Sequence, residues 1–89
     1  MNYKVQAILS IDTDNLPENF DVILKEEQAV VAQWKQEGIL EHLFLRDTKN
    51  GAILLFNGLS EDEVKEKMKT LPFYQIKKHI EYYNLIQQF

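Results

Sequence analysis

The chain has 89 residues, and ten Lys or Arg against fourteen Asp or Glu leave a formal net charge of −4. With no cysteine, it can form neither a disulfide framework nor a thiolate zinc site, and its acidic balance argues against binding nucleic acid. Residues 1–5 lack the features of a secretory signal, and no apolar run approaches the roughly 18 residues that span a bilayer. We therefore predict a cytoplasmic protein with neither nucleic acid nor membrane as a partner.

The first half of the chain predicts a strand, a loop and a long helix. Apolar and polar residues alternate over residues 3–11, as in a strand with one buried face. Residues 12–17 are of the types found in turns and helix caps, so they predict a loop. A helix should run from about residue 18 to 37, because Gly38 follows at the position where glycine commonly ends a helix.

The second half predicts a hairpin, a shorter helix and a last strand. Strands are expected at 39–46 and 52–56, joined by a turn that contains the hairpin-forming pair Asn50-Gly51. Ser60 and Glu63 form a capping box that opens a helix, which should end near Leu71 because Pro72 cannot continue it. The last strand should cover about residues 76–86. This order of elements predicts one ferredoxin-like α+β domain over residues 1–89, with both helices on one face of a four-stranded antiparallel sheet.

The predicted sheet is apolar on both faces. Residues 52–56 are apolar at five consecutive positions, and the strands at 39–46 and 76–86 carry apolar side chains on either side. In a monomer, the face away from the helices would be polar. A second copy of the chain would cover this apolar face symmetrically, so we predict a homodimer or a higher homo-oligomer.

Glu27 is the most informative candidate site residue. At about 100° per residue, it falls at the centre of the apolar stripe of the first helix, whose other members are Phe20, Ile23, Leu24, Val30, Val31 and Trp34. A carboxylate that faces an apolar core has a raised pKa unless cations or donors meet it, and such a group can serve as a general acid or base. The alternative is that Glu27 pairs with a structural donor and does no chemistry.

Two histidines and an aromatic loop complete the set of candidates. His42 shares an apolar strand face with Leu40 and Phe44, where it is either a proton shuttle or a satisfied rim residue. His79 is expected at the rim of the last strand. Residues 71–74 join the second helix to that strand, and Phe73 and Tyr74 could wall a cleft or plug the core. No glycine-rich phosphate loop, metal-ligand spacing or nucleophile motif is present.

The stretch from Leu24 to Tyr74 resembles the muconolactone Δ-isomerase family of dimeric α/β-barrel proteins. The resemblance rests on Glu27 in a helix ending in Gln36-Glu37-Gly38, on His42-Leu43-Phe44 in the next strand, and on Leu71-Pro72 followed by Phe73-Tyr74. It implies paired ferredoxin-like subunits, a pocket between sheet and helices, and no cofactor. The family's reaction moves a proton between carbons of an unsaturated lactone that bears a carboxylate.

At three positions the chain departs from the family pattern. Leu40-Glu41 stands where the family has Trp-Arg before the histidine, and Leu45 stands where it has an Arg. Arg46 is displaced by one residue and would face the other side of the sheet. Cations that could hold an anionic substrate are therefore missing from these positions.

Three functional hypotheses follow. The first is a cofactor-independent isomerase with Glu27 as general base, with His42 orienting or protonating the enolate, and with Trp34, Phe73 and Tyr74 binding the substrate, a small organic acid or lactone. The second is a non-catalytic oligomeric module that binds a metabolite or a protein. The third is a cofactor-free monooxygenase with a dry pocket. The isomerase predicts a raised Glu27 pKa and a cavity reached by both Glu27 and His42, whereas the module predicts no cavity or a Glu27 paired with a cation.

Overall fold

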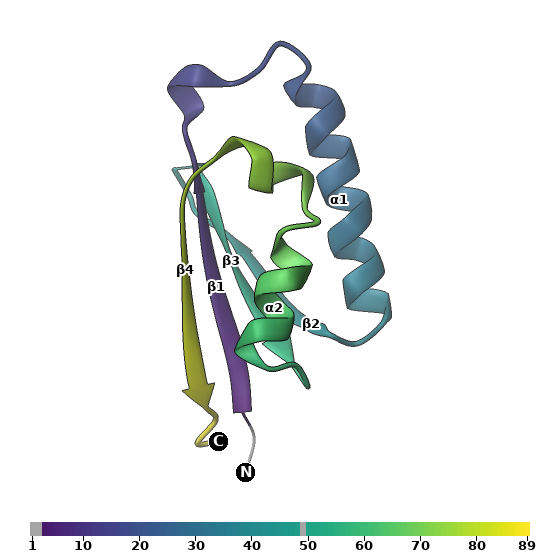
Figure 1. The fold of residues 1–89 in the computed structure, drawn as a ribbon, viewed down its shortest axis with the longest axis vertical. Helices are drawn as coiled ribbons and strands as arrows, with labels where there is room; N and C mark the ends of the chain where they lie inside the picture. The colour runs from purple at the N-terminus through teal and green to yellow at the C-terminus, as the bar shows by residue number, and fades with distance from the viewer. Residues whose placement is uncertain (1–2, 49) are drawn as a thin grey trace.

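The computed structural model describes residues 3–48 and 50–89, and it has the predicted ferredoxin-like α+β architecture (Figure 1). The elements in chain order are β1 (Tyr3–Ile11), the 3-10 turn η1 (Thr13–Asn15), α1 (Phe20–Gln36), β2 (Leu40–Leu45), β3 (Gly51–Asn57), α2 (Glu61–Met68), the 3-10 turn η2 (Pro72–Ile76) and β4 (Lys77–Ile86). The strands form one antiparallel sheet in the order β2-β3-β1-β4. Within the described residues, no helix is both long and apolar enough to cross a membrane.

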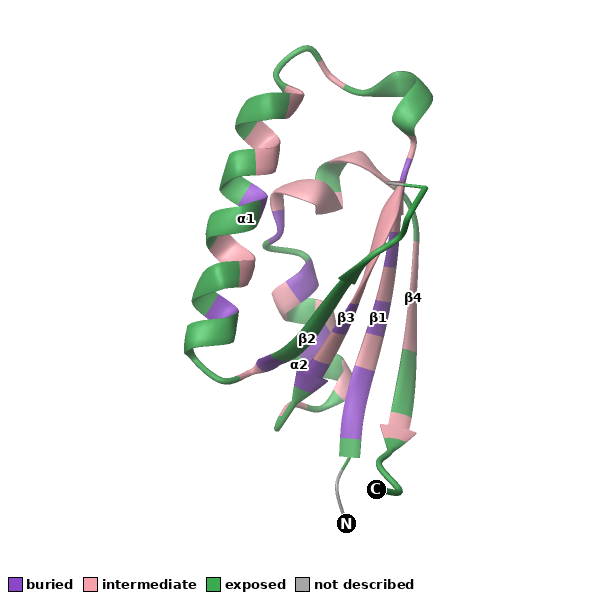
Figure 2. Ribbon diagram, turned by 180° about the vertical axis from the view of Figure 1, so that it is seen from behind, coloured by how far each residue is buried: buried purple, intermediate pink, exposed green. Residues whose placement is uncertain are grey.

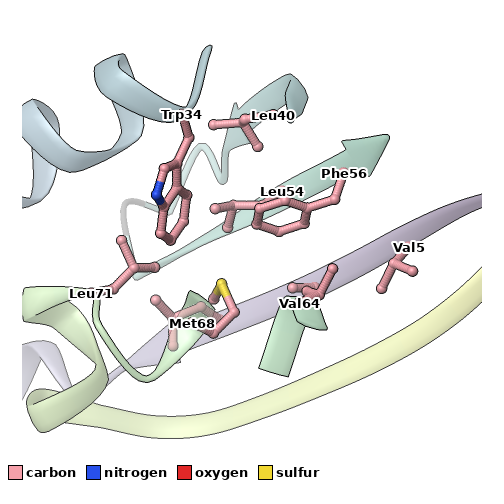
Figure 3. Packing of buried hydrophobic residues seen from close by; sticks show 10 residues of the cluster. Val5, Trp34, Leu40, Leu54, Phe56, Val64, Met68 and Leu71 are labelled. Carbon is pink, nitrogen blue, oxygen red and sulfur yellow. The ribbon is translucent and has the colours of Figure 1, made fainter. Parts of the chain in front are cut away.

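The core lies between the sheet and the two helices, which cover the same face. Alternate residues of β1 and β3 point into it, and α1 contributes Trp34 while α2 contributes Val64 and Met68 (Figure 3). Phe56 of β3 is fully buried, and its ring centroid lies 5.7 Å from that of Trp34. The edge strand β2 is covered poorly: of its six residues only Leu40 is buried (Figure 2).

Three local features differ from the predictions. The second helix ends at Met68, three residues before Leu71, and the Thr70 hydroxyl donates to the Lys67 carbonyl oxygen just beyond this end. The segment after Pro72 forms the turn η2, which was not predicted, before β4 begins. The register between β2 and β3 shifts between Leu40 and His42, so Leu40 faces the helices while His42 faces away from them.

The predicted hairpin between β2 and β3 forms, and Asn50-Gly51 lies where its turn ends and β3 begins. Residues 46–50, of which residue 49 lies outside the described residues, connect β2 to β3, so the pair is not a two-residue turn. Gly51 begins β3 opposite Ser10, and a Cβ atom there would lie 2.5 Å from the carbonyl oxygen of Leu9. Glycine is therefore required at this position by the close approach of the β1 backbone.

Candidate functional site

Glu27 lies on the inner face of α1, where the helix packs against η2. Its side chain is buried with 8% exposure, as the centre of the apolar stripe predicts. The Phe73 backbone N–H donates to Glu27 Oε1 at 3.0 Å. Phe73 follows Pro72 in the first turn of η2, where N–H groups have no partner within the turn. Leu71, at the N-cap position of η2, has no side-chain acceptor for this N–H group, and the Glu27 carboxylate supplies one instead.

The two carboxylate oxygens of Glu27 have different surroundings. Oε1 accepts from Phe73, while Oε2 accepts no hydrogen bond from the residues that the structure describes. In the same part of the chain, no fully buried side-chain oxygen lacks a partner, so Oε2 keeps some accessible surface. Burial raises the pKa of Glu27 above its ordinary value, and the hydrogen bond from Phe73 offsets part of this rise. No described Lys, Arg or His forms an ion pair with it.

The raised pKa of Glu27 makes a prediction for stability. Because the pKa of Glu27 is higher in the folded than in the unfolded state, the folded protein binds the Glu27 proton more tightly. The stability that this proton contributes is complete below the unfolded pKa and is lost as pH rises through the folded pKa. Glu27→Gln keeps an acceptor for Phe73 and cannot ionise. In calorimetry, we expect the variant and the wild type to have the same melting temperature at pH 4 and the variant to have the higher one at pH 8. Each kcal/mol of stability that the ionised wild type loses corresponds to about 4–8 °C. Equal melting temperatures at pH 8 would contradict the burial argument.

An apolar cavity of about 300 Å³ lies beside Glu27, between α1, β1, the β2–β3 edge and η2. Its walls are Leu9, Ile11, Leu24, Gln28, Leu45, Gly51, Ala52 and Phe73. Glu27 is not itself a wall residue, but it precedes Gln28 and accepts the hydrogen bond from Phe73. The Phe73 ring stacks on Phe20 with centroids 5.7 Å apart, which fixes this wall against α1.

His42 is not brought together with Glu27 within one chain. Its ring stacks on Phe44 at 5.9 Å between centroids, on the sheet face away from the helices. It borders a hollow on that face and a groove at the α1–β2 edge, and Glu27 lines neither. The predicted neighbour Leu40 faces the helices instead, because the register shift rotates it relative to His42. The catalytic role of His42 stays a prediction.

The structure separates the three residues predicted to bind substrate. Phe73 lines the apolar cavity. Trp34 is 5% exposed and packs in the core against Phe56, so it does not wall this cavity. Tyr74 lines a different groove, between α2 and β4, where the Lys77 ammonium lies 4.1 Å from its ring centroid.

Sequence reasoning missed Gln28, which lines both the apolar cavity and the groove at the α1–β2 edge. It stands about 100° around α1 from Glu27, at the margin of the apolar stripe, where a glutamine is indistinguishable from any exposed polar residue. His79, as predicted, is exposed on β4, and its Nε2 lies 2.8 Å from Glu81 Oε1. In the described part of the chain, no group of three or more His, Asp or Glu side chains is placed to hold a metal ion.

Comparison with known proteins connects this geometry to a family. The chain is similar in structure to muconolactone isomerase, with a TM-score of 0.74 and 18% identity over 99% of this chain and 91% of that one. It also resembles 5-chloro-2-hydroxyhydroquinone dehydrochlorinase from Burkholderia phenoliruptrix, solved with 2,5-dihydroxybenzoquinone. That match has a TM-score of 0.61 and 17% identity, and covers 93% of this chain and 94% of that one.

A third structure, a protein from Pseudomonas aeruginosa, matches with a TM-score of 0.58 and 11% identity over 97% of this chain and 93% of that one. At these identities the structural matches establish the fold alone. No curated protein matches the sequence. The model of the muconolactone delta-isomerase family, however, matches residues 1–82. The chain therefore belongs to the muconolactone Δ-isomerase family.

Proposed function

We propose that this protein is a cofactor-independent isomerase that moves a proton between carbons of a small unsaturated lactone or organic acid, with Glu27 as the general base. The observation that carries the proposal is a buried carboxylate with one oxygen held by the Phe73 N–H and the other not fully buried, next to two wall residues of an apolar cavity, Gln28 and Phe73. Desolvation makes such a carboxylate a stronger base than an exposed one. Membership of the muconolactone Δ-isomerase family supports the same reaction class.

The proposed reaction needs a single proton carrier. Glu27 Oε2 removes a proton from the carbon next to the carbonyl, and the electron pair spreads over the carbonyl and the adjacent double bond. The accessible Oε2 carboxyl exchanges its proton with solvent and then protonates the far end of this system, which shifts the double bond and restores the carboxylate. Phe73 holds Oε1 throughout and so fixes the direction of Oε2. The predicted role of His42 in orienting or protonating the enolate would require it to act from the groove at the α1–β2 edge, which it lines together with Gln28.

Proton exchange in heavy water tests this proposal directly. A small unsaturated lactone is incubated with the protein in D2O, and the signals of the two carbons that bear the exchangeable protons are followed by NMR. We expect deuterium to enter at these positions, and the double bond to move, faster than in buffer with the same amount of Glu27→Gln protein. Rates equal to that control for a panel of lactones and unsaturated acids would overturn the proposal.

We further propose that the chain works as a homodimer or larger homo-oligomer, paired through the sheet face opposite the helices. The register of the strands places on this face the apolar side chains Ile8, Phe44, Ile53, Leu55, Tyr83 and Leu85. Phe44 is 56% exposed and Tyr83 47%. Two charged groups share this face. The Lys4 ammonium is paired with Glu41 Oε2 at 2.6 Å and donates to Asn57 Oδ1 at 2.9 Å, and the Glu81 carboxylate accepts from the Tyr83 hydroxyl at 2.9 Å. A second copy is the partner that such a face fits best.

Ile53→Lys places a charge at the middle of this face. Burying an unpaired ammonium in an interface costs several kcal/mol, so we expect light scattering to show the mass of one chain for this variant and at least twice that for the wild type. Val22→Lys, on the 54% exposed position of α1, is the matched control and should assemble normally. An Ile53→Lys protein that assembles like the wild type would rule out this face.

A further inference from the structure

The lining of the apolar cavity carries information about the charge of its ligand. Six of its eight wall residues have apolar side chains, one is glycine, and only Gln28 brings a polar side chain. None of the described wall residues carries a positive charge. Lys35 lines the neighbouring groove instead, and Arg46 and Lys78 line a separate hollow that also contains Asp12 and Asp14.

A substrate carboxylate would meet two penalties in this cavity. It would lose its hydration against apolar walls without gaining a cation. It would also lie close to Glu27, because this carboxylate accepts the N–H of the wall residue Phe73 and precedes the wall residue Gln28. Glu27 has to be ionised to act as a base, and like charges in a poorly hydrated site repel strongly. An uncharged molecule avoids both penalties. The volume of about 300 Å³ lies at the lower end of ligand sites and suits a compact ring.

Gln28 is placed to serve the one polar requirement of the proposed reaction. When Glu27 removes a proton next to a lactone carbonyl, negative charge develops on the carbonyl oxygen, and a hydrogen-bond donor there stabilises the transition state. The Gln28 amide is the only polar side chain among the described wall residues. Because Gln28 directly follows Glu27 on α1, the donor and the base are carried on the same rigid element.

We propose that the cavity accepts uncharged unsaturated lactones in preference to lactones bearing a carboxylate, and that the Gln28 amide donates to the carbonyl oxygen on which the negative charge develops. This inference rests on the function proposed above. With 5-methylfuran-2(3H)-one, Glu27 would take a proton from C3, the charge would reside on the oxygen facing Gln28, and the proton would return to C5. The product, 5-methylfuran-2(5H)-one, is an isomer, so no oxidant or second reactant is required.

Three lactones separate charge from size: the 5-methyl compound, its 5-carboxymethyl analogue and the methyl ester of that analogue. Isomerisation is followed by the ultraviolet absorbance of the conjugated product, with the uncatalysed rate subtracted. We expect the two neutral compounds to be isomerised, with kcat/KM for the ester at least tenfold above that for the acid. An acid that reacts as fast as its ester overturns the inference and leaves the isomerase intact. No turnover of any of the three overturns the isomerase as well.

Variants of α1 test the role of Gln28. Gln28→Leu should lower kcat for the methyl lactone by about 10²-fold without changing the fold, as checked by circular dichroism. Gln33→Leu is the matched control and should leave kcat unchanged, because Gln33 is exposed on the same helix, as Gln28 is, but lines neither the cavity nor the groove at the α1–β2 edge. A Gln28→Leu protein with the wild-type kcat overturns the assignment of Gln28 as the carbonyl donor.

Discussion

Glu27→Gln is expected to lower kcat for lactone isomerisation by about 10²–10⁴-fold, the range typical of removing a positioned general base. Glutamine preserves the size of the side chain and an oxygen that can accept from the Phe73 N–H at the same place. It has no oxygen that can carry the proton between the two carbons. The loss should therefore fall on kcat, with KM changed little, because the cavity walls are untouched.

The control for this prediction is Glu26→Gln, which removes a neighbouring carboxylate that is exposed to solvent. It should retain kcat within about twofold and thereby exclude a general effect of charge on α1. The rate of the wild type should also rise with pH through the raised pKa of Glu27 and then level off, because the base acts only when ionised. A Glu27→Gln protein within tenfold of wild-type kcat would exclude Glu27 as the base.

Phe56→Ala is expected to destabilise the fold by about 3–5 kcal/mol, the cost of truncating a fully buried phenylalanine. Phe56 is 0% exposed and contacts Trp34 of α1 across the core. Truncation would leave a void between the sheet and the helix that carries Glu27, and close packing elsewhere in the core prevents its collapse. Because small domains are held by only about 5–15 kcal/mol, much of the chain should be unfolded well below the wild-type melting temperature.

The matched control for this truncation is Phe89→Ala at the fully exposed C-terminal residue. Urea unfolding of both variants, at one protein concentration, compares the same chemical change in the two environments. The exposed truncation should alter the free energy of unfolding by less than about 0.5 kcal/mol. A Phe56→Ala protein that unfolds within 1 kcal/mol of the wild type would show that the core is not centred on β3.

The sequence predicts the fold and the position of Glu27 because both depend on local periodicity. The order of elements follows from strand alternation, the Ser60–Glu63 capping box and the stop signals at Gly38 and Pro72. The burial of Glu27 follows from its place on the apolar stripe of α1. The hydrogen-bond partner of Glu27 could not be predicted, because Phe73 lies 46 residues along the chain and its N–H points at the carboxylate only when residues 72–76 form the turn η2.

Strand alternation does not predict which face a side chain occupies where the pairing between strands is irregular. A simple two-residue alternation puts His42 with Leu40, but one irregular pairing in β2 separates them onto opposite faces. Trp34 lies on the same apolar stripe of α1 as Glu27, but it packs in the core and does not line the cavity. Helical periodicity identifies the buried face of α1 and does not tell which of its residues meet the core and which meet a cavity. The sequence does not identify Gln28 as a wall residue, because the other cavity walls come from distant parts of the chain, including β1, β3 and η2.

The most direct test of the account is a carboxyl-resolved NMR pH titration of the isotopically labelled protein, with the exposed Glu26 as the internal reference. We expect Glu27 to titrate clearly above the ordinary glutamate value of about 4.3, because its burial is only partly offset by the Phe73 N–H. We also expect the Glu27 signal to move when an unsaturated lactone is added. A Glu27 that titrates at or below the ordinary value and ignores every lactone would contradict the account, and the chain would then be an oligomeric binding module.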